Sequence, residues 1–386
     1  MRSATKILIP LSIAFISARA SAETLITAFE TNGTLTFVEN PVLTNHIYSV
    51  EWATSPAGLW NNSWDTLNPV AVTGSNTTVQ VPMFFRVVAR TNAPVTFEYV
   101  TVGDPSNPPD TTFIPSGVGA VTTAYRIGKY EVTVGQYVKF LNAVDPNGDN
   151  ALELYSPFMS GIRGGVWYIP SNGVGSRYVL KAGADNKPLL FVSIIDAMRF
   201  CNWVHNGALP GGDTEDGAYT LIGGGVSPSN AATVTRNPGA KVCLPTEDEW
   251  YKAAYYQPSS QGGDSDSYWE YPTMSNVVPT KENPPGGNNS ANYGRVLQGP
   301  AVVGMYSNSP SYYGTFDQAG NAFEWTETID PSSNWRVWRG GDWDVGPSER
   351  RPPDAPTFTR SAEFNLAPPV PTPGFNVGFR VVAPVP

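Results

Sequence analysis

The sequence predicts a mixed α+β domain that is poor in regular structure, preceded by a small all-β domain. Three observations support this fold class. The 386 residues include 37 Gly and 36 Pro, which indicates many turns and few long helices. Helix starts are marked at three places, each by a hydroxyl residue ahead of an apolar stripe. The remaining apolar runs are short, and some alternate with polar residues as strands do.

Residues 1–22 have the pattern of a secretory signal peptide. Basic residues come before a short apolar core, Ile7 to Ser17, and Ala20-Ser21-Ala22 meets the small-residue cleavage rule. A membrane anchor would need about 20 apolar residues, and neither this run nor any later one is long enough. We therefore expect an exported protein (secreted, periplasmic or at the cell surface) whose mature chain begins at Glu23.

Residues 23–95 are predicted to form a small sandwich-like β domain. Apolar and polar residues alternate over 47–52, and a second apolar run covers 79–88, with Gly- and Asn-containing turns between strands. His46 is interpreted as a surface residue. This domain contains no catalytic constellation that we recognise.

Residues 96–386 form the second predicted domain, which opens with a strand over 125–132. A capping box predicts the start of each of its helices. In such a box a Ser or Thr caps the helix, and the side chain three residues later bonds back to the backbone amide of that cap residue. The boxes are Thr133 with Gln136, Ser193 with Asp196, and Thr246 with Glu249. Short strands are expected at 166–168 and 336–338, and residues 276–292 are expected to be mostly loop.

The chain has two cysteines and two histidines. Cys201 falls on the apolar face of the second predicted helix and Cys243 just ahead of the third, so both a disulfide and two buried thiols stay open. His205 ends a predicted helix before Gly207, a place that the helix dipole favours for a histidine. The net charge of −9, with no Lys or Arg cluster, argues against nucleic-acid binding.

Six motifs, in order, resemble those of the formylglycine-generating enzyme family, also called sulfatase-modifying factors, over residues 98–382. They are Gly128-Lys129-Tyr130-Glu131-Val132-Thr133, Val192-Ser193-Ile194-Ile195-Asp196-Ala197, Leu244-Pro245-Thr246-Glu247-Asp248-Glu249-Trp250, Gly320-Asn321-Ala322-Phe323-Glu324-Trp325, Arg339-Gly340-Gly341-Asp342-Trp343 and Asn376-Val377-Gly378-Phe379-Arg380-Val381. The resemblance implies a single-domain fold related to C-type lectins.

The family's oxidase converts a sulfatase cysteine to formylglycine with a copper ion held by two thiolates, which suit Cu(I). By position, the matching residues in this sequence are Val345 and Arg350, and neither can bind Cu(I). The resemblance therefore implies that no copper is bound, and an oxidase activity would require that the alignment after Trp343 is wrong or that the metal is bound elsewhere.

The resemblance also implies a Ca²⁺ site, with carbonyl ligands from Ala319, Gly320 and Ala322 and a carboxylate from Glu324. A carboxylate in a Gly-containing loop can join main-chain carbonyls around a hard cation. In the alternative, Glu324 and Asn321 tie the loop to its own backbone. A second calcium site of the family matches only at Asn292 and Tyr293, and its acidic loop is missing.

Three functional readings follow. The first is a non-catalytic exported pseudoenzyme that acts as a binding or structural module, with an unknown protein or glycan ligand. The second is a formylglycine-generating oxidase. The third is another enzyme activity that uses the carboxylates Asp342, Asp344 and Glu349, although acidic loops are more often solvated or paired with arginines. Trp250, Trp325 and Trp343 lie inside motifs and are expected to fill the core.

Overall fold

The computed structural model describes residues 95–112, 117–330, 335–344, 360–361 and 376–386, together with the backbone of the strands between residues 23 and 91. The chain divides into two compact units, Met1–Ala93 and Pro94–Pro386. The expected signal peptide, residues 1–22, lies outside the described residues.

The described part of the first unit consists of antiparallel strand pairs. Its strands are β1 (Glu23–Phe29), β2 (Leu35–Asn40), β3 (His46–Ala53), β4 (Ala71–Thr73), β5 (Asn76–Thr78) and β6 (Phe84–Thr91). β1 pairs with β2, β4 with β5, and β3 with β6. The alternating run 47–52 lies within β3, as predicted. Residues 84–88 of the second predicted run lie within β6, and residues 79–83 lie outside the described residues.

The three capping boxes of the second unit do start helices. These are α1 (Val134–Val144), α2 (Ile194–His205) and α3 (Glu247–Tyr255). Two short 3₁₀ turns also occur, η1 (Pro157–Ser160) after α1 and η2 (Ser259–Gln261) after α3. In every box both reciprocal bonds are present between the cap residue and the residue three positions on. Because each box satisfies helix-start amides locally, the sequence alone sufficed to find these starts.

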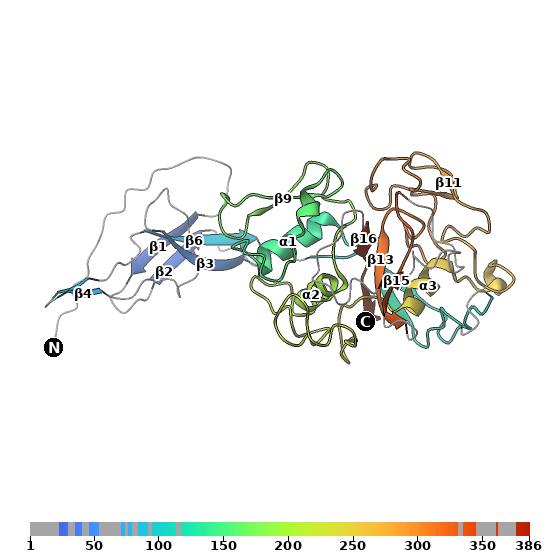
Figure 1. Ribbon diagram of the computed structural model, residues 1–386, viewed down its shortest axis with the longest axis horizontal. Coiled ribbons are helices and arrows are strands. Elements are labelled where there is room, and N and C mark those ends of the chain that lie inside the picture. The colour runs from blue at the N-terminus through green and yellow to red at the C-terminus, as the bar shows by residue number, and fades with distance from the viewer. Residues whose placement is uncertain are drawn as a thin grey trace. The chain divides into compact units, whose positions relative to one another are not determined.

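Short strands make up the sheets of the second unit (Figure 1). One sheet has the order β15 (Arg360–Ser361), β14 (Trp335–Arg339), β13 (Phe323–Asp330), β16 (Val377–Phe379), and another β17 (Val382–Pro384), β8 (Tyr125–Gly128), β7 (Tyr99–Val102). Two pairs complete the set: β9 (Val166–Tyr168) with β10 (Tyr178–Leu180), and β11 (Thr280–Lys281) with β12 (Ser290–Ala291).

The strand predicted over 125–132 ends earlier, at Gly128. Beyond it the Lys129 amide still donates to the carbonyl of Glu98, the residue before β7, whereas the Val132 amide donates to the carbonyl of Phe379 in β16. Val132 is still buried in the core, so periodicity alone could not locate the strand end.

Aromatic side chains connect α1 and α2 to the sheet that contains β13 and β16. Phe140 of α1 lies 5.5 Å from Phe200 of α2, and Phe200 lies 5.4 Å from Phe379 of β16, between ring centroids. Trp250, Trp325 and Trp343 are all buried, which confirms that they fill the core. In the part of the chain that the structure describes, no helix has the length and apolarity needed to cross a membrane.

Candidate functional site

The Gly320–Trp325 motif begins as a tight loop and continues as β13. Gly320 has φ +100°, and a Cβ there would lie 2.5 Å from the Asn292 carbonyl oxygen, so the loop needs glycine at this position. The Gly320 amide donates to the Gly340 carbonyl at 2.6 Å. This bond joins the motif to the Arg339–Trp343 segment.

Glu324 is fully buried against an arginine. β13 and β16 run parallel and side by side (Figure 1). Glu324 stands opposite Gly378 in this pair, which brings Arg380 next to the carboxylate. Arg380 donates to both carboxylate oxygens, at 2.5 and 2.6 Å, and the Trp250 indole donates to one of them at 2.8 Å. Burial by itself would lower the pKa of Arg380, but the adjacent carboxylates, Glu324 first among them, together have the larger effect, so the pKa of Arg380 is raised. A bidentate pair of this kind is strong and geometrically specific.

This arrangement bears on the predicted calcium ligands Ala319, Gly320, Ala322 and Glu324. The Gly320 carbonyl accepts the Ala322 amide at 2.8 Å. The guanidinium of Arg380 donates to both oxygens of Glu324, so the carboxylate as it stands in the structure does not fit a cation ligand. The calcium site stays a prediction. The alternative is a structural brace, in which Glu324 holds the loop by its ion pair with Arg380.

Asn321 ties the loop to distant segments and not to its own backbone. Its side-chain amide donates to Glu131 at 2.9 Å, and its side-chain oxygen accepts the Ala301 amide at 2.8 Å and the Asn292 amide group at 3.1 Å. Its carbonyl accepts the Trp343 amide at 3.1 Å. Four motifs and loops therefore meet at this one residue, which has a left-handed backbone that Asn tolerates (φ +64°).

Two further carboxyl groups lie near the Arg380–Glu324 pair. Burial, and then the proximity of Asp317, raise the pKa of Glu131 well above its usual range. One Glu131 oxygen has no hydrogen-bond partner. Burial also raises the pKa of Asp317 to about 6. Burial and the nearby Asp317 carboxylate therefore favour the protonated form of Glu131.

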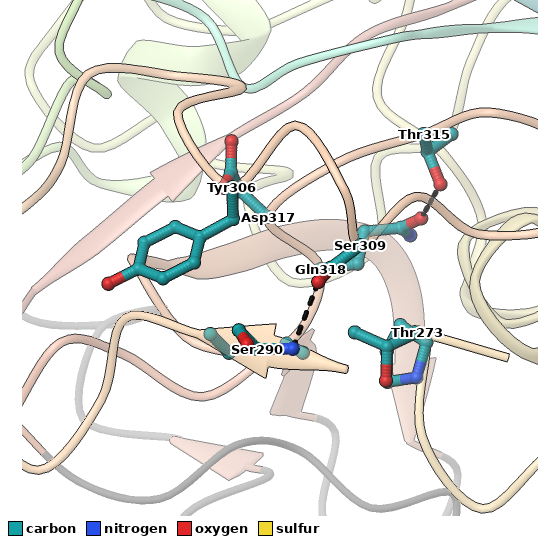
Figure 2. A pocket seen from close by; sticks show the side chains of 10 residues that line it. Thr273, Ser290, Tyr306, Ser309, Thr315, Asp317 and Gln318 are labelled. Atoms are coloured by element: carbon teal, nitrogen blue, oxygen red, sulfur yellow. Dashed lines mark hydrogen bonds between the residues drawn. The ribbon is translucent and has the colours of Figure 1, made fainter. Parts of the chain in front are cut away.

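A small polar cavity lies beside this cluster (Figure 2). Hydroxyl side chains and the Asp317 carboxylate line much of it, and the Ser309 hydroxyl accepts the Ser290 amide at 2.9 Å. Its volume of about 10 Å³ is near the minimum that one water molecule requires. The cavity is therefore too small for an organic ligand.

The acidic residues of the third functional reading are engaged where the structure describes them. Asp342 is buried and accepts the Asn376 side-chain amide at 2.6 Å and the Asp344 backbone amide at 3.0 Å. Asp344 pairs with Arg295. Glu349 lies outside the described residues, as do the two positions that match the copper ligands, Val345 and Arg350.

Both cysteines are free thiols buried in the core. Cys201 lies in α2, and the Cys243 backbone exchanges two hydrogen bonds with Val382 of β17. Burial raises the pKa of both thiols, to about 12 for Cys243. His205 ends α2 as predicted, and its ring nitrogen accepts the Lys241 amide at 3.1 Å. Among the described residues no three His, Cys, Asp or Glu side chains are grouped so as to hold a metal ion.

Arg380, Glu131 and Asn292 are the residues of this centre whose roles sequence reasoning missed. Glu131 and Arg380 lie in the quoted motifs and Asn292 at the partial match of the second calcium site, but their side chains carry no local signal. Glu131 bonds to Asn321, 190 positions away, and Arg380 bonds to Glu324, 56 positions away. Only the fold brings these partners together.

Comparison with known proteins agrees with the six motifs. Residues 100–385 match the family described as "Sulfatase-modifying factor enzyme 1-like domain". No curated protein matches the chain. Among solved structures, the chain is similar to Treponema denticola variable protein 1 (20% identity, TM-score 0.44, 77% of this chain and 98% of that one). It is also similar to CarF (20%, 0.43, 75% and 99%) and to PvdO from Pseudomonas aeruginosa (14%, 0.35, 76% and 100%). Because the family match spans most of the chain, the protein belongs to the sulfatase-modifying factor (formylglycine-generating enzyme-like) family.

Proposed function

We propose that the protein is a non-catalytic member of its family, exported, and used as a binding or structural module. The observation that carries the proposal is the burial of both cysteine thiols. A Cu(I) site of the family's kind needs two thiolates together, and the sequence has only Cys201 and Cys243 to offer. Both are buried in the core, where burial disfavours the thiolate that a metal requires.

The third reading, an enzyme built on Asp342, Asp344 and Glu349, has less support. A catalytic acid or base must be able to reach the group that it protonates or deprotonates. Asp342 is buried and bonded to Asn376, and Asp344 is paired with Arg295. These contacts favour a role for the two described carboxylates in fixing the Arg339–Trp343 segment.

Copper binding and peptide oxidation test the proposal together. Exported material is purified, and N-terminal sequencing is expected to begin at Glu23; an intact Met1 would refute export with cleavage. The protein is then titrated with Cu(I) and incubated with a peptide that carries the sulfatase cysteine motif. We expect no stoichiometric copper and no change in peptide mass. Tight binding of one copper per chain, with formylglycine formed in the peptide, would overturn the non-catalytic proposal.

A calcium ion at this loop, with Glu324 as its carboxylate ligand, is the competing proposal that the resemblance implies. The bidentate Arg380 contact weighs against it, since a cation would have to share or displace a guanidinium.

A further inference from the structure

The β9–β10 hairpin presents an exposed aromatic residue. Val166 of β9 is buried and the next residue, Trp167, is 49% exposed, because successive side chains of a strand point to opposite faces. Lys181 directly follows β10, and its ammonium lies 4.1 Å from the centroid of the Trp167 ring. Beneath them Tyr168 and Tyr178 pack ring to ring at 5.4 Å, which supports the hairpin.

The loop before β9 is held at two points. The Lys181 ammonium donates to the Ser160 and Gly161 carbonyls, each at 2.5 Å. The guanidinium of Arg163 lies 4.3 Å from the ring of buried Trp343. Between these anchors Ile162 is 98% exposed. The groups are thus held in place before any ligand arrives, which lowers the entropic cost of binding.

This part of the protein is basic, although the chain as a whole is acidic. No Asp or Glu occurs from residue 154 to residue 184, in a chain with 33 acidic residues. Within the described ranges, no carboxylate forms an ion pair with Arg163 or Lys181. The β9 surface, defined as Ile162, Arg163, Trp167 and Lys181, therefore combines apolar area with positive charge that no described carboxylate neutralises.

We propose that the β9 surface binds an acidic polysaccharide, with Trp167 stacking on a sugar ring and Arg163 and Lys181 facing its carboxylates. An indole offers a flat, rigid apolar face, and cations beside it pair with anionic groups of the same ligand. A protein partner would need a wider apolar centre, and this surface has two exposed apolar side chains. The inference rests on the proposed binding function and names its ligand class.

Electrophoresis of the full mature protein through gels that contain polygalacturonate tests the proposal. We expect retardation that decreases as salt is raised. Trp167→Ala should weaken binding roughly tenfold and Trp167→Phe should restore part of it. Arg163→Gln should also weaken it. Lys139→Gln makes the same charge change on an exposed face of α1 and should leave retardation unchanged.

Three polymers separate the possible outcomes. Dextran has sugar rings without charge, polyglutamate has carboxylates without sugar rings, and neither should retard the protein as polygalacturonate does. Equal retardation by polyglutamate, or a Trp167→Ala variant that melts and migrates like the parent, would overturn the proposal. Absence of retardation by polygalacturonate would do the same, but the proposed non-catalytic role would then still stand, because the copper and peptide assay tests it separately.

Discussion

At the scale of single residues, the buried pair of Glu324 and Arg380 decides between a structural brace and a metal ligand. In Glu324→Gln the shape is kept but the Arg380 charge loses its counterion inside the core. Breaking a buried pair from one side costs about 3 kcal/mol or more. We expect the melting temperature to fall by several degrees, and by the same amount in calcium and in chelator.

The matched control is Asp344→Asn, the same acid-to-amide change in an exposed pair with Arg295. Exposed pairs contribute little, so this variant should melt close to the parent. If the parent protein instead gains several degrees in calcium and Glu324→Gln abolishes the gain, the carboxylate is a calcium ligand and the brace is wrong. A ligand present at a hundred times its dissociation constant would stabilise the fold by about 2.7 kcal/mol.

The sequence located Glu324 as important but could not name its partner. The local sequence around a carboxylate in a glycine-rich loop can be the same whether the carboxylate binds a cation or pairs with a guanidinium. The difference depends on the parallel pairing of β13 with β16, which sets Glu324 opposite Gly378. This register is a tertiary fact, and no local pattern around Glu324 encodes it.

At the scale of elements, the N-terminus of α2 should make stability depend on pH. Asp196 is buried; one of its oxygens accepts the Ser193 amide at 2.8 Å and the other has no partner. Burial raises its pKa to about 7, against about 4 in an unfolded chain. The folded state therefore binds this proton more tightly, and the stabilisation that results is fully present below pH 4 and is lost as pH rises through 7.

Asp196→Asn keeps an oxygen acceptor for the Ser193 amide but has no proton to lose. We expect the free energy of unfolding of the parent to fall by roughly 2 to 4 kcal/mol more than that of the variant between pH 5 and pH 8. Denaturant titrations at both pH values measure this difference. Ser193→Ala, which removes the other half of the box, should cost about 1 kcal/mol at both pH values. Parallel pH profiles for parent and Asp196→Asn would contradict the assignment.

The helix starts could be predicted from the sequence because a capping box is a local interaction over four residues. The ends of short strands could not. β8 stops at Gly128 although the apolar pattern continues, since Val132 bonds to Phe379 in a different sheet. An apolar residue shows that a segment is buried, but not which segment it pairs with.

At the scale of the whole molecule, the second unit is closed by its own two ends. β7, near its start, and β17, at the end of the chain, both pair with β8. The family motifs predicted one domain over this range but gave no sign that the last residues are structural. Val382 and Ala383 are buried, and Val382 also exchanges two hydrogen bonds with Cys243.

This closure predicts different effects for three truncations. A chain that ends at Val381 loses β17 and two buried side chains, which should cost about 3 kcal/mol or more. A chain that ends at Pro384 loses only exposed residues and should melt like the parent. A chain that starts at Pro94 keeps the β7–β8–β17 sheet and should fold alone, with an unchanged transition for this unit. Circular dichroism melts of the three proteins provide the measurement. If the chain ending at Val381 melts like the parent, β17 does not close the unit; if the chain starting at Pro94 fails to fold, the second unit depends on the first.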